Sequence, residues 1–247
     1  MKLFIYVEGQ EEEMFVNRLL RGYLNPFGIL VQKPVLAATS FRASDGDEIE
    51  ITVGGVTNYN SIRDDILNQF ASDNITISDA LTTFIDLYAL PTDFPGYPDA
   101  LMQKLAGAQK ASFIEKAWTV DIGRPNFFPY IQVHEFEALV LTQPSVLNNY
   151  YPEHAASIEK LRKECAQFRS PEDINEAKST SPSHRILSRL PTYQKIDGFR
   201  HLQDIGLPAL KAHCPRFKTW LEQCEGFFKQ SKVVHAKQWP KSVPPPQ

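Results

Sequence analysis

The sequence has few cysteines and no long apolar run. Cys165, Cys214 and Cys224 lie far apart, and no Cys-x-x-Cys pair indicates a zinc site. We therefore expect three reduced, structural thiols. No apolar run approaches the ~18 residues of a membrane-spanning helix. Acidic residues between Glu8 and Glu13 also interrupt the segment where a signal peptide would lie. These absences predict a cytoplasmic protein without membrane contact.

The glycine-rich loops that bind nucleotide phosphates are missing as well. No Gly-x-x-x-x-Gly-Lys-Ser/Thr segment is present, so ATP hydrolysis by this chain is not expected, and no Gly-x-Gly-x-x-Gly follows the first apolar run. His134 and Glu135 begin like a zinc-protease His-Glu-x-x-His helix, but Ala138 replaces the second histidine. The sequence therefore contains none of these nucleotide-binding or zinc-protease motifs.

The composition is that of a folded protein with a sizeable core. The 247 residues are 43% hydrophobic and 11% aromatic, with a net charge of −3. The charge is uneven, because 9 Lys and Arg stand against 4 Asp and Glu from Lys195 to the end. That local excess could attract a phosphate backbone, although a solvated face is the commoner explanation.

Apolar, β-rich runs alternate with helical patterns in the first 143 residues. Strands are predicted at 3–8, 29–38, 81–86 and 126–133, and helices at 11–23, 61–71 and 98–117. Residues 42–60 are predicted to form a loop with a short edge strand. The alternation favours an α/β fold with a mostly parallel sheet flanked by helices.

The pattern changes beyond Gln143. Residues 144–230 predict short helices interrupted by prolines, which form a helical lobe packed on the α/β domain of residues 1–143. Residues 231–247 end in Ser-Val-Pro-Pro-Pro-Gln and predict a flexible, proline-rich tail.

Carboxylates stand where the predicted strands end. Glu8 ends the first strand, Asp86 ends a later one, and Glu135 with Glu137 follows the last. The carboxyl ends of parallel strands share one edge, where ligands bind. Carboxylates gathered there repel one another unless a cation or protons hold them. A single acid at a strand end is usually a cap or a surface charge, but three such coincidences favour a site.

Oxygen ligands of this kind suit Mg²⁺ or Mn²⁺, which can activate water for phosphodiester cleavage. Asp93, in the loop after Asp86, is a further candidate ligand, with a plain turn residue as the alternative. His134 could act as a general base or as a structural histidine. Arg185 and Lys195 are candidate contacts for a substrate phosphate. The acidic run 45–48 follows no apolar strand, and we interpret it as a solvated loop.

Three segments resemble a bacterial family of unknown function, DUF4276. They are Val7-Glu8-Gly9-Gln10-Glu11-Glu12, Ile85-Asp86-Leu87-Tyr88 with Pro95-Gly96, and Pro129-Tyr130-Ile131-Gln132-Val133 running into His134-Glu135-Phe136-Glu137-Ala138-Leu139. Later segments around Arg185, Lys195 and Trp220 also fit, so the resemblance covers nearly the whole chain.

That family in turn resembles the Toprim fold of topoisomerases, primases and the nucleases of OLD-type phage-defence systems. The resemblance implies a metal-binding or acid/base glutamate, carried here by Glu8, and an Asp-x-Asp pair, carried in part by Asp86. The sequence departs from the pattern at Tyr88, where a second aspartate is expected. Asp93, Glu135 or Glu137 would have to replace it.

The leading hypothesis is therefore a Toprim-like, Mg²⁺- or Mn²⁺-dependent nuclease that acts on DNA or RNA. The resemblance further implies an effector of an anti-phage system that works with a separate ATPase partner. The alternatives are a non-catalytic, Toprim-shaped binding or sensor subunit and an enzyme acting on small phosphoesters. The sequence leaves open whether the protein forms a homo-oligomer.

Overall fold

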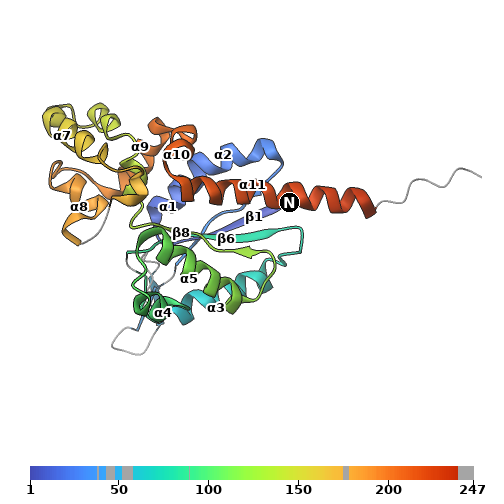
Figure 1. Cartoon of the computed structure of the whole chain (residues 1–247). Coiled ribbons are helices and arrows are strands. Elements are labelled where there is room, and N and C mark those ends of the chain that lie inside the picture. Colours follow the sequence, from blue (N-terminus) through green and yellow to red (C-terminus); the bar gives the residue numbers. More distant parts are fainter. Residues whose placement is uncertain (38, 43–47, 52–57, 89, 175–177, 239–247) are drawn as a thin grey trace, which may run out of the picture.

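A parallel β-sheet forms the centre of the molecule (Figure 1). The computed structural model describes residues 1–37, 39–42, 48–51, 58–88, 90–174 and 178–238. The six-stranded sheet has the order β2-β1-β6-β7, with β3 also paired to β1 and β8 to β6, and every pairing is parallel. Its strands are β1 (Lys2–Val7), β2 (Leu30–Val31), β3 (Val35–Leu36), β6 (Ala80–Asp86), β7 (Phe127–Phe128) and β8 (Ile131–Gln132). The predicted mostly parallel α/β fold is confirmed.

Helices cover both faces of the sheet. Alternate residues of β1 enter two separate apolar clusters, Leu3 and Ile5 on one face and Phe4 and Tyr6 on the other. The first face is covered by α1 (Gln10–Phe15), α2 (Arg21–Leu24), α10 (Leu207–His213) and α11 (Pro215–Gln238). The second is covered by α3 (Tyr59–Ser72), α4 (Tyr97–Met102) and α5 (Gly107–Ile122). The result is a three-layer arrangement.

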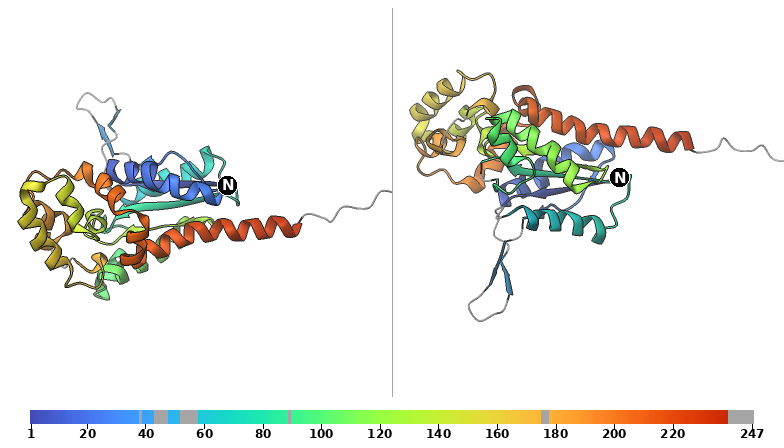
Figure 2. Two further views of the ribbon diagram at one scale, coloured as in Figure 1. Left: turned by 90° about the horizontal axis from the view of Figure 1, so that it is seen from above. Right: turned by 60° about the horizontal axis from the view of Figure 1, so that its bottom comes forward.

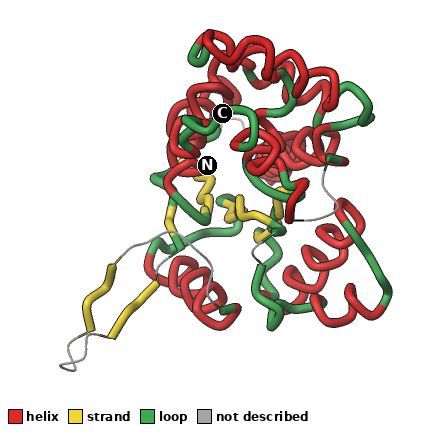
Figure 3. Tube along the Cα trace, turned by 90° about the vertical axis from the view of Figure 1, so that its left-hand side faces the viewer, coloured by secondary structure: helices red, strands yellow, loops and turns green. Residues whose placement is uncertain are grey.

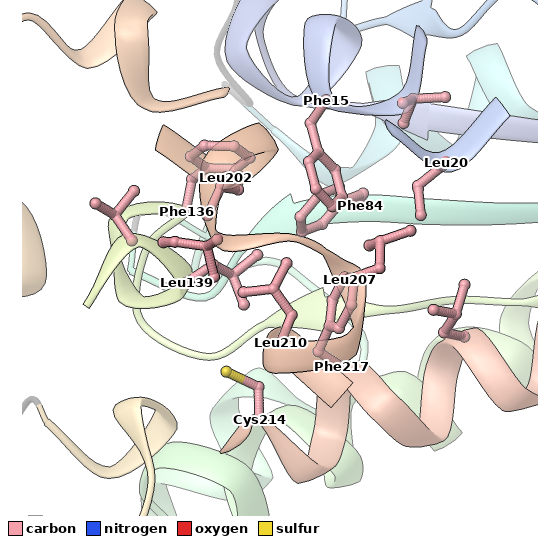
Figure 4. Packing of buried hydrophobic residues seen from close by; sticks show 14 of the residues in the cluster. Phe15, Leu20, Phe84, Phe136, Leu139, Leu202, Leu207, Leu210, Cys214 and Phe217 are labelled. Carbon is pink, nitrogen blue, oxygen red and sulfur yellow. The ribbon is translucent and has the colours of Figure 1, made fainter. Parts of the chain in front are cut away.

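Phenylalanines from several elements pack against one another on the first face of the sheet (Figure 4). The Phe15 ring of α1 meets Phe84 of β6 at 5.6 Å between centroids, Phe136 at 5.9 Å and Phe217 of α11 at 6.0 Å. Edge-to-face pairs add about 0.5–1.5 kcal/mol each beyond their buried area. These contacts hold the strand ends and α1 in one rigid unit.

The remaining helices continue this first core instead of forming a separate one. α7 (Ala155–Cys165), α8 (Pro182–Leu187) and α9 (Gly198–Ile205) contribute Ile158, Ile186 and Leu202 to the same apolar cluster as β1. α6 (Glu137–Val140) joins them to the sheet. Seen from above, these helices lie beyond one end of the sheet (Figure 2). No helix in the described part of the chain is long and apolar enough to cross a membrane.

The structure differs from the expected elements at several points. The run 98–117 forms two helices, because Lys104 adopts a left-handed φ of 54° and Ala106 is extended before α5. Pro129 divides the last strand into β7 and β8, since proline has no N–H for the ladder. α11 is one long helix that continues to Gln238, through residues 231–238 that had been predicted as tail.

A small antiparallel hairpin stands apart from the main sheet. It consists of β4 (Thr39–Arg42) and β5 (Glu48–Ile51), within the region expected to be a loop with an edge strand. The Cα trace shows it projecting away from the body (Figure 3). Residues 45–47 of the acidic run lie outside the described residues, as do residues 239–247 of the tail.

Candidate metal centre

Glu8 leaves the carboxyl end of β1 and turns towards β6. Its Oε2 accepts a hydrogen bond from the backbone N–H of Asp86 at 2.9 Å, and its own N–H donates to the Phe84 carbonyl oxygen. Burial raises the pKa of Glu8, and the hydrogen bond from Asp86 and the charge of Lys195 offset the rise only in part. The two parallel strands thus bring Glu8 and Asp86 together, as expected from their positions.

The first turn of α1 adds two more carboxylates. Glu12 is buried and its Oε2 accepts the Gly9 N–H at 3.0 Å, which caps the helix. Burial and the neighbouring Glu8 raise the pKa of Glu12 to about 8. Burial, followed by the charges of Glu137 and Glu12, raises the pKa of Glu11 to about 9.

Gly198 makes room for the Glu11 carboxylate. A Cβ at this position would lie 2.8 Å from Glu11 Oε1 and 3.1 Å from Phe136 Cε1. The start of α9 therefore packs directly on the site. Among the described residues, Glu11 Oε1 has no hydrogen-bond donor although it is shielded from solvent.

Asp86 lies between the strand ends and the chain that follows β8. Its Oδ2 accepts the Phe136 N–H at 3.2 Å, whereas Oδ1 has no hydrogen-bond partner among the described residues. Burial raises the pKa of Asp86 well above its usual value, and the charges of Glu8, Glu12 and Glu137 add to the rise. One oxygen of this carboxylate is therefore positioned and the other is available for a ligand.

Glu135 and Glu137 approach from the segment that enters α6. The Ser183 N–H of α8 donates to Glu135 Oε2 at 2.9 Å, while Glu137 is only 1% exposed and lies 3.2 Å from Lys195 Nζ. Burial raises the pKa of Glu137 although Lys195 lowers it. Burial lowers the pKa of Lys195, but Glu137, Glu135 and Glu11 outweigh that effect and raise it.

We call Glu8, Glu11, Glu12, Asp86, Glu135 and Glu137 the carboxylate cluster. Its members come from three segments at one edge of the sheet, and the charges of most of them perturb one another's protonation. Lys195, on the short 3₁₀ helix Lys195–Asp197, is the cation whose charge acts on them. If all six were ionised, the cluster would carry more negative charge than one lysine neutralises, and the raised pKa values mean that it holds protons instead.

The other predicted site residues lie in different surroundings. Asp93 is exposed and accepts the Tyr59 N–H at the start of α3, so the structure does not bring it to the cluster. Arg185 donates to the Thr180 carbonyl oxygen and lies 3.6 Å from a Glu164 oxygen, within the helical lobe.

His134 is buried immediately before the cluster segment. It has a left-handed φ of 67°, rare for a residue with a side chain, and this turn redirects the chain from β8 towards α6. A Cβ on Gly107 would lie 4.0 Å from His134 Cε1, which places this edge of the imidazole near the start of α5. The backbone of His134 thus shapes the site.

Glu11 and Glu12 were missed as site residues by the sequence reasoning. Acids in a first helical turn were explained by the helix dipole, which is their usual role. The available signal was spacing, because a glutamate three or four residues beyond Glu8, across a glycine and at the start of a helix, can fold back over the strand end.

The donor chemistry of the cluster suits a hard divalent cation. All six side chains offer carboxylate oxygens, the ligands preferred by Mg²⁺ and Mn²⁺, and Asp86 Oδ1 and Glu11 Oε1 are shielded without a partner in the described chain. As they stand, no three Asp, Glu, His or Cys side chains among the described residues are arranged to hold a metal ion. The carboxylates would have to rotate towards a shared ion, with Lys195 moving off Glu137.

Comparisons with known proteins place the chain in a family. No curated protein matches it. It is similar to the C-terminal region of the Burkholderia pseudomallei OLD protein, with 14% identity over 93% of this chain and 97% of that chain and a TM-score of 0.44. The corresponding region of the Xanthomonas campestris pv. campestris OLD protein gives 15% identity over 94% and 96% of the two chains and a TM-score of 0.45. The model described as Domain of unknown function (DUF4276) matches residues 7–225, and the chain therefore belongs to this family, as its motifs indicated.

Proposed function

We propose that the protein cleaves phosphodiester bonds of nucleic acid at the carboxylate cluster, with Mg²⁺ or Mn²⁺ as cofactor. The supporting observation is the raised pKa of five cluster carboxyls: Glu8, Glu11, Glu12, Asp86 and Glu137. Buried carboxylates keep such an arrangement only when protons or cations neutralise them. A divalent cation would replace those protons and would be held by the same oxygens.

The strand ends supply the fixed part of the site. Glu8 and Asp86 would hold the cation, since backbone N–H groups already orient one oxygen of each. Glu12 and Glu137, whose charges act on Asp86, would complete the set. A bound ion at this position would supply an activated water and stabilise the leaving oxygen. Lys195 would then turn its charge towards the substrate phosphate.

A cleavage assay on labelled single-stranded DNA, duplex DNA and RNA tests the proposal. We expect Mn²⁺ or Mg²⁺ to support cleavage of at least one substrate, EDTA to abolish it, and Glu8→Gln to remove it. Asp93→Asn is the matched control, because Asp93 lies outside the cluster, and it should leave cleavage unchanged. Cleavage that persists in EDTA or in Glu8→Gln would refute a metal-dependent reaction at this site.

A non-catalytic binding subunit is the second candidate. It is favoured by the side-chain arrangement, which holds no ready metal site in the described residues, and by Tyr88, which stands where the Toprim pattern has an aspartate. Binding of Mn²⁺ without cleavage of any nucleic acid would support this reading. Hydrolysis confined to small phosphoesters would instead support the third candidate, an enzyme that acts on such compounds.

The role in anti-phage defence, the separate ATPase partner and a homo-oligomeric state remain predictions. The first two follow from the Toprim resemblance and from the lack of an ATP-binding loop in the sequence. Co-purification of the tagged protein from its native host, followed by an ATPase assay, tests the partner. Recovery of the protein alone, without any ATPase, would count against it.

A further inference from the structure

Tyr88 lies between two segments of the carboxylate cluster. It follows Asp86 by two residues, and its N–H donates to the His134 carbonyl oxygen at 2.9 Å, directly before Glu135. Leu87, the residue between, is buried in the apolar core of the second face. The backbone of Tyr88 thereby joins the chain that follows Asp86 to the segment that carries Glu135 and Glu137.

The side chain of Tyr88 differs from the other exposed aromatic residues of the described chain. Phe27, 37% exposed, packs on the Tyr23 ring at 5.6 Å, and Tyr150, 38% exposed, donates its hydroxyl to Asp204 at 2.9 Å. Tyr88 is 44% exposed and makes neither a ring contact nor a side-chain hydrogen bond within the described residues. It is an exposed aromatic ring, two residues beyond Asp86, with no partner among the described residues.

A nucleic-acid site built from carboxylates needs an uncharged source of affinity. The cluster and the overall charge of −3 repel phosphates, and a bound cation offsets only part of this repulsion. Stacking of a base on an aromatic ring increases affinity by about five- to 150-fold per base and does not depend on charge. Paired bases are already stacked inside a duplex, so this contribution favours single strands.

We propose that Tyr88 stacks on an unpaired base next to the scissile phosphate and makes the protein selective for single-stranded nucleic acid. The inference rests on the proposed function, since it assumes that the phosphodiester lies at the carboxylate cluster. It assigns a substrate-selecting role to the position at which the Toprim pattern has a second aspartate.

Fluorescence anisotropy of the full chain with a labelled single-stranded oligonucleotide tests the proposal. The assay uses Ca²⁺ in place of Mn²⁺, and a second oligonucleotide carries abasic sites on the same backbone. We expect wild type to bind the base-bearing strand about tenfold more tightly than the abasic one. Tyr88→Ala should remove that difference, Tyr88→Trp should retain it, and Phe27→Ala, at a similarly exposed ring, should not alter it.

The salt dependence separates stacking from a structural effect. The loss in Tyr88→Ala should be the same at low and high salt, whereas loss of a phosphate contact shrinks as salt rises. Equal binding of both strands by wild type, or an unchanged preference in Tyr88→Ala, would overturn the proposal. If Mn²⁺-dependent cleavage persists in that case, the inference alone fails. Absence of cleavage of every substrate instead refutes the proposed function.

Discussion

The two ends of strand β6 each carry a shielded aspartate, and the two are in opposite electrostatic states. At the amino end, Asp79 accepts hydrogen bonds from the Lys2 N–H at 2.8 Å and from both the N–H and the hydroxyl of Thr76. These bonds outweigh burial and lower the pKa of Asp79. At the carboxyl end, Asp86 receives one long hydrogen bond, and burial, together with the charges of Glu8, Glu12 and Glu137, raises its pKa.

We interpret the difference as that between a structural carboxylate and a candidate ligand. Hydrogen-bond donors of its own chain stabilise the ionised Asp79, so this residue contributes to the stability of the fold without a bound ligand. Asp86 receives little stabilisation from hydrogen bonds of its own chain, and its ionised form adds negative charge to the carboxylate cluster. Such a residue destabilises the folded protein unless something else binds to it, and raised carboxyl pKa values of this kind are typical of functional sites.

Asp86→Asn is expected to have the largest effect on activity. It would remove the charge of a proposed metal ligand from the cluster, so cleavage should fall on the order of 100-fold or more. The metal-free variant should unfold at a higher temperature than wild type, because repulsion among the acids is reduced. Calorimetric scanning and a Mn²⁺ cleavage assay measure both; wild-type cleavage in the variant would remove Asp86 from the site.

Asp79→Asn should lower the stability of the protein and leave metal binding unchanged. The amide group cannot accept all three donors, so the free energy of unfolding should fall by about 2 kcal/mol, as for hydrogen bonds to a charged group. Urea denaturation measures the loss. Mn²⁺ affinity should remain that of wild type, and a loss of metal binding without a loss of stability would undo the contrast between the two strand ends.

The stability of the metal-free protein should fall as the pH rises. The pKa of Glu11 is raised to about 9 and that of Glu12 to about 8, from a usual 4.5. A raised pKa means that the folded state binds protons more tightly, so the stabilisation is complete below about pH 4.5 and is lost as the pH passes through 8 to 9.

Asp79 has the opposite sign, because its lowered pKa contributes stability that is lost only in acid. Thermal unfolding from about pH 5 to pH 9 should therefore show a falling midpoint without metal and a much smaller fall with Mn²⁺. A midpoint that rises over this range in the metal-free protein would contradict the assignment of the raised pKa values.

Lys195→Met should have a smaller effect. It should increase Mn²⁺ affinity and decrease cleavage. The Lys195 side chain is 51% exposed and pairs with Glu137. Because solvent screens the lysine end of this pair, we treat the pair as worth roughly 0.2–1 kcal/mol, and its removal should increase Mn²⁺ affinity by about 1.4- to fivefold. Cleavage should fall if the lysine contacts phosphate. Lys163→Met, at an exposed pair with Glu159, should change neither quantity. A lower Mn²⁺ affinity in Lys195→Met would show that the lysine does not compete with the ion.

The sequence predicts the strand ends well because their signal is local. The apolar runs before Glu8 and Asp86 are typical of buried strands, and parallel pairing necessarily brings their carboxyl ends together. The contribution of Glu12 was not predictable in this way, since its approach depends on how α1 folds back onto β1 through packing of Phe15.

Asp93 shows that closeness in sequence does not imply closeness in the folded protein. It is close to Asp86 in sequence, but the loop places it at the start of α3, where the Tyr59 N–H binds its carboxylate. Arg185 likewise pairs inside the helical lobe, whereas Lys195, ten residues later, reaches the cluster. Separation along the sequence does not predict such tertiary contacts, which depend on how the elements pack.

Calorimetric titration of the metal-free protein with Mn²⁺ near pH 7, in two buffers of different ionisation enthalpy, tests the central claim most directly. Because Glu11 and Glu12 have pKa values of about 9 and 8, they bind protons at this pH, and metal binding must release them. We predict saturable binding with proton release that disappears in Asp86→Asn and persists in Asp79→Asn. No binding, or binding without proton release, would contradict the account.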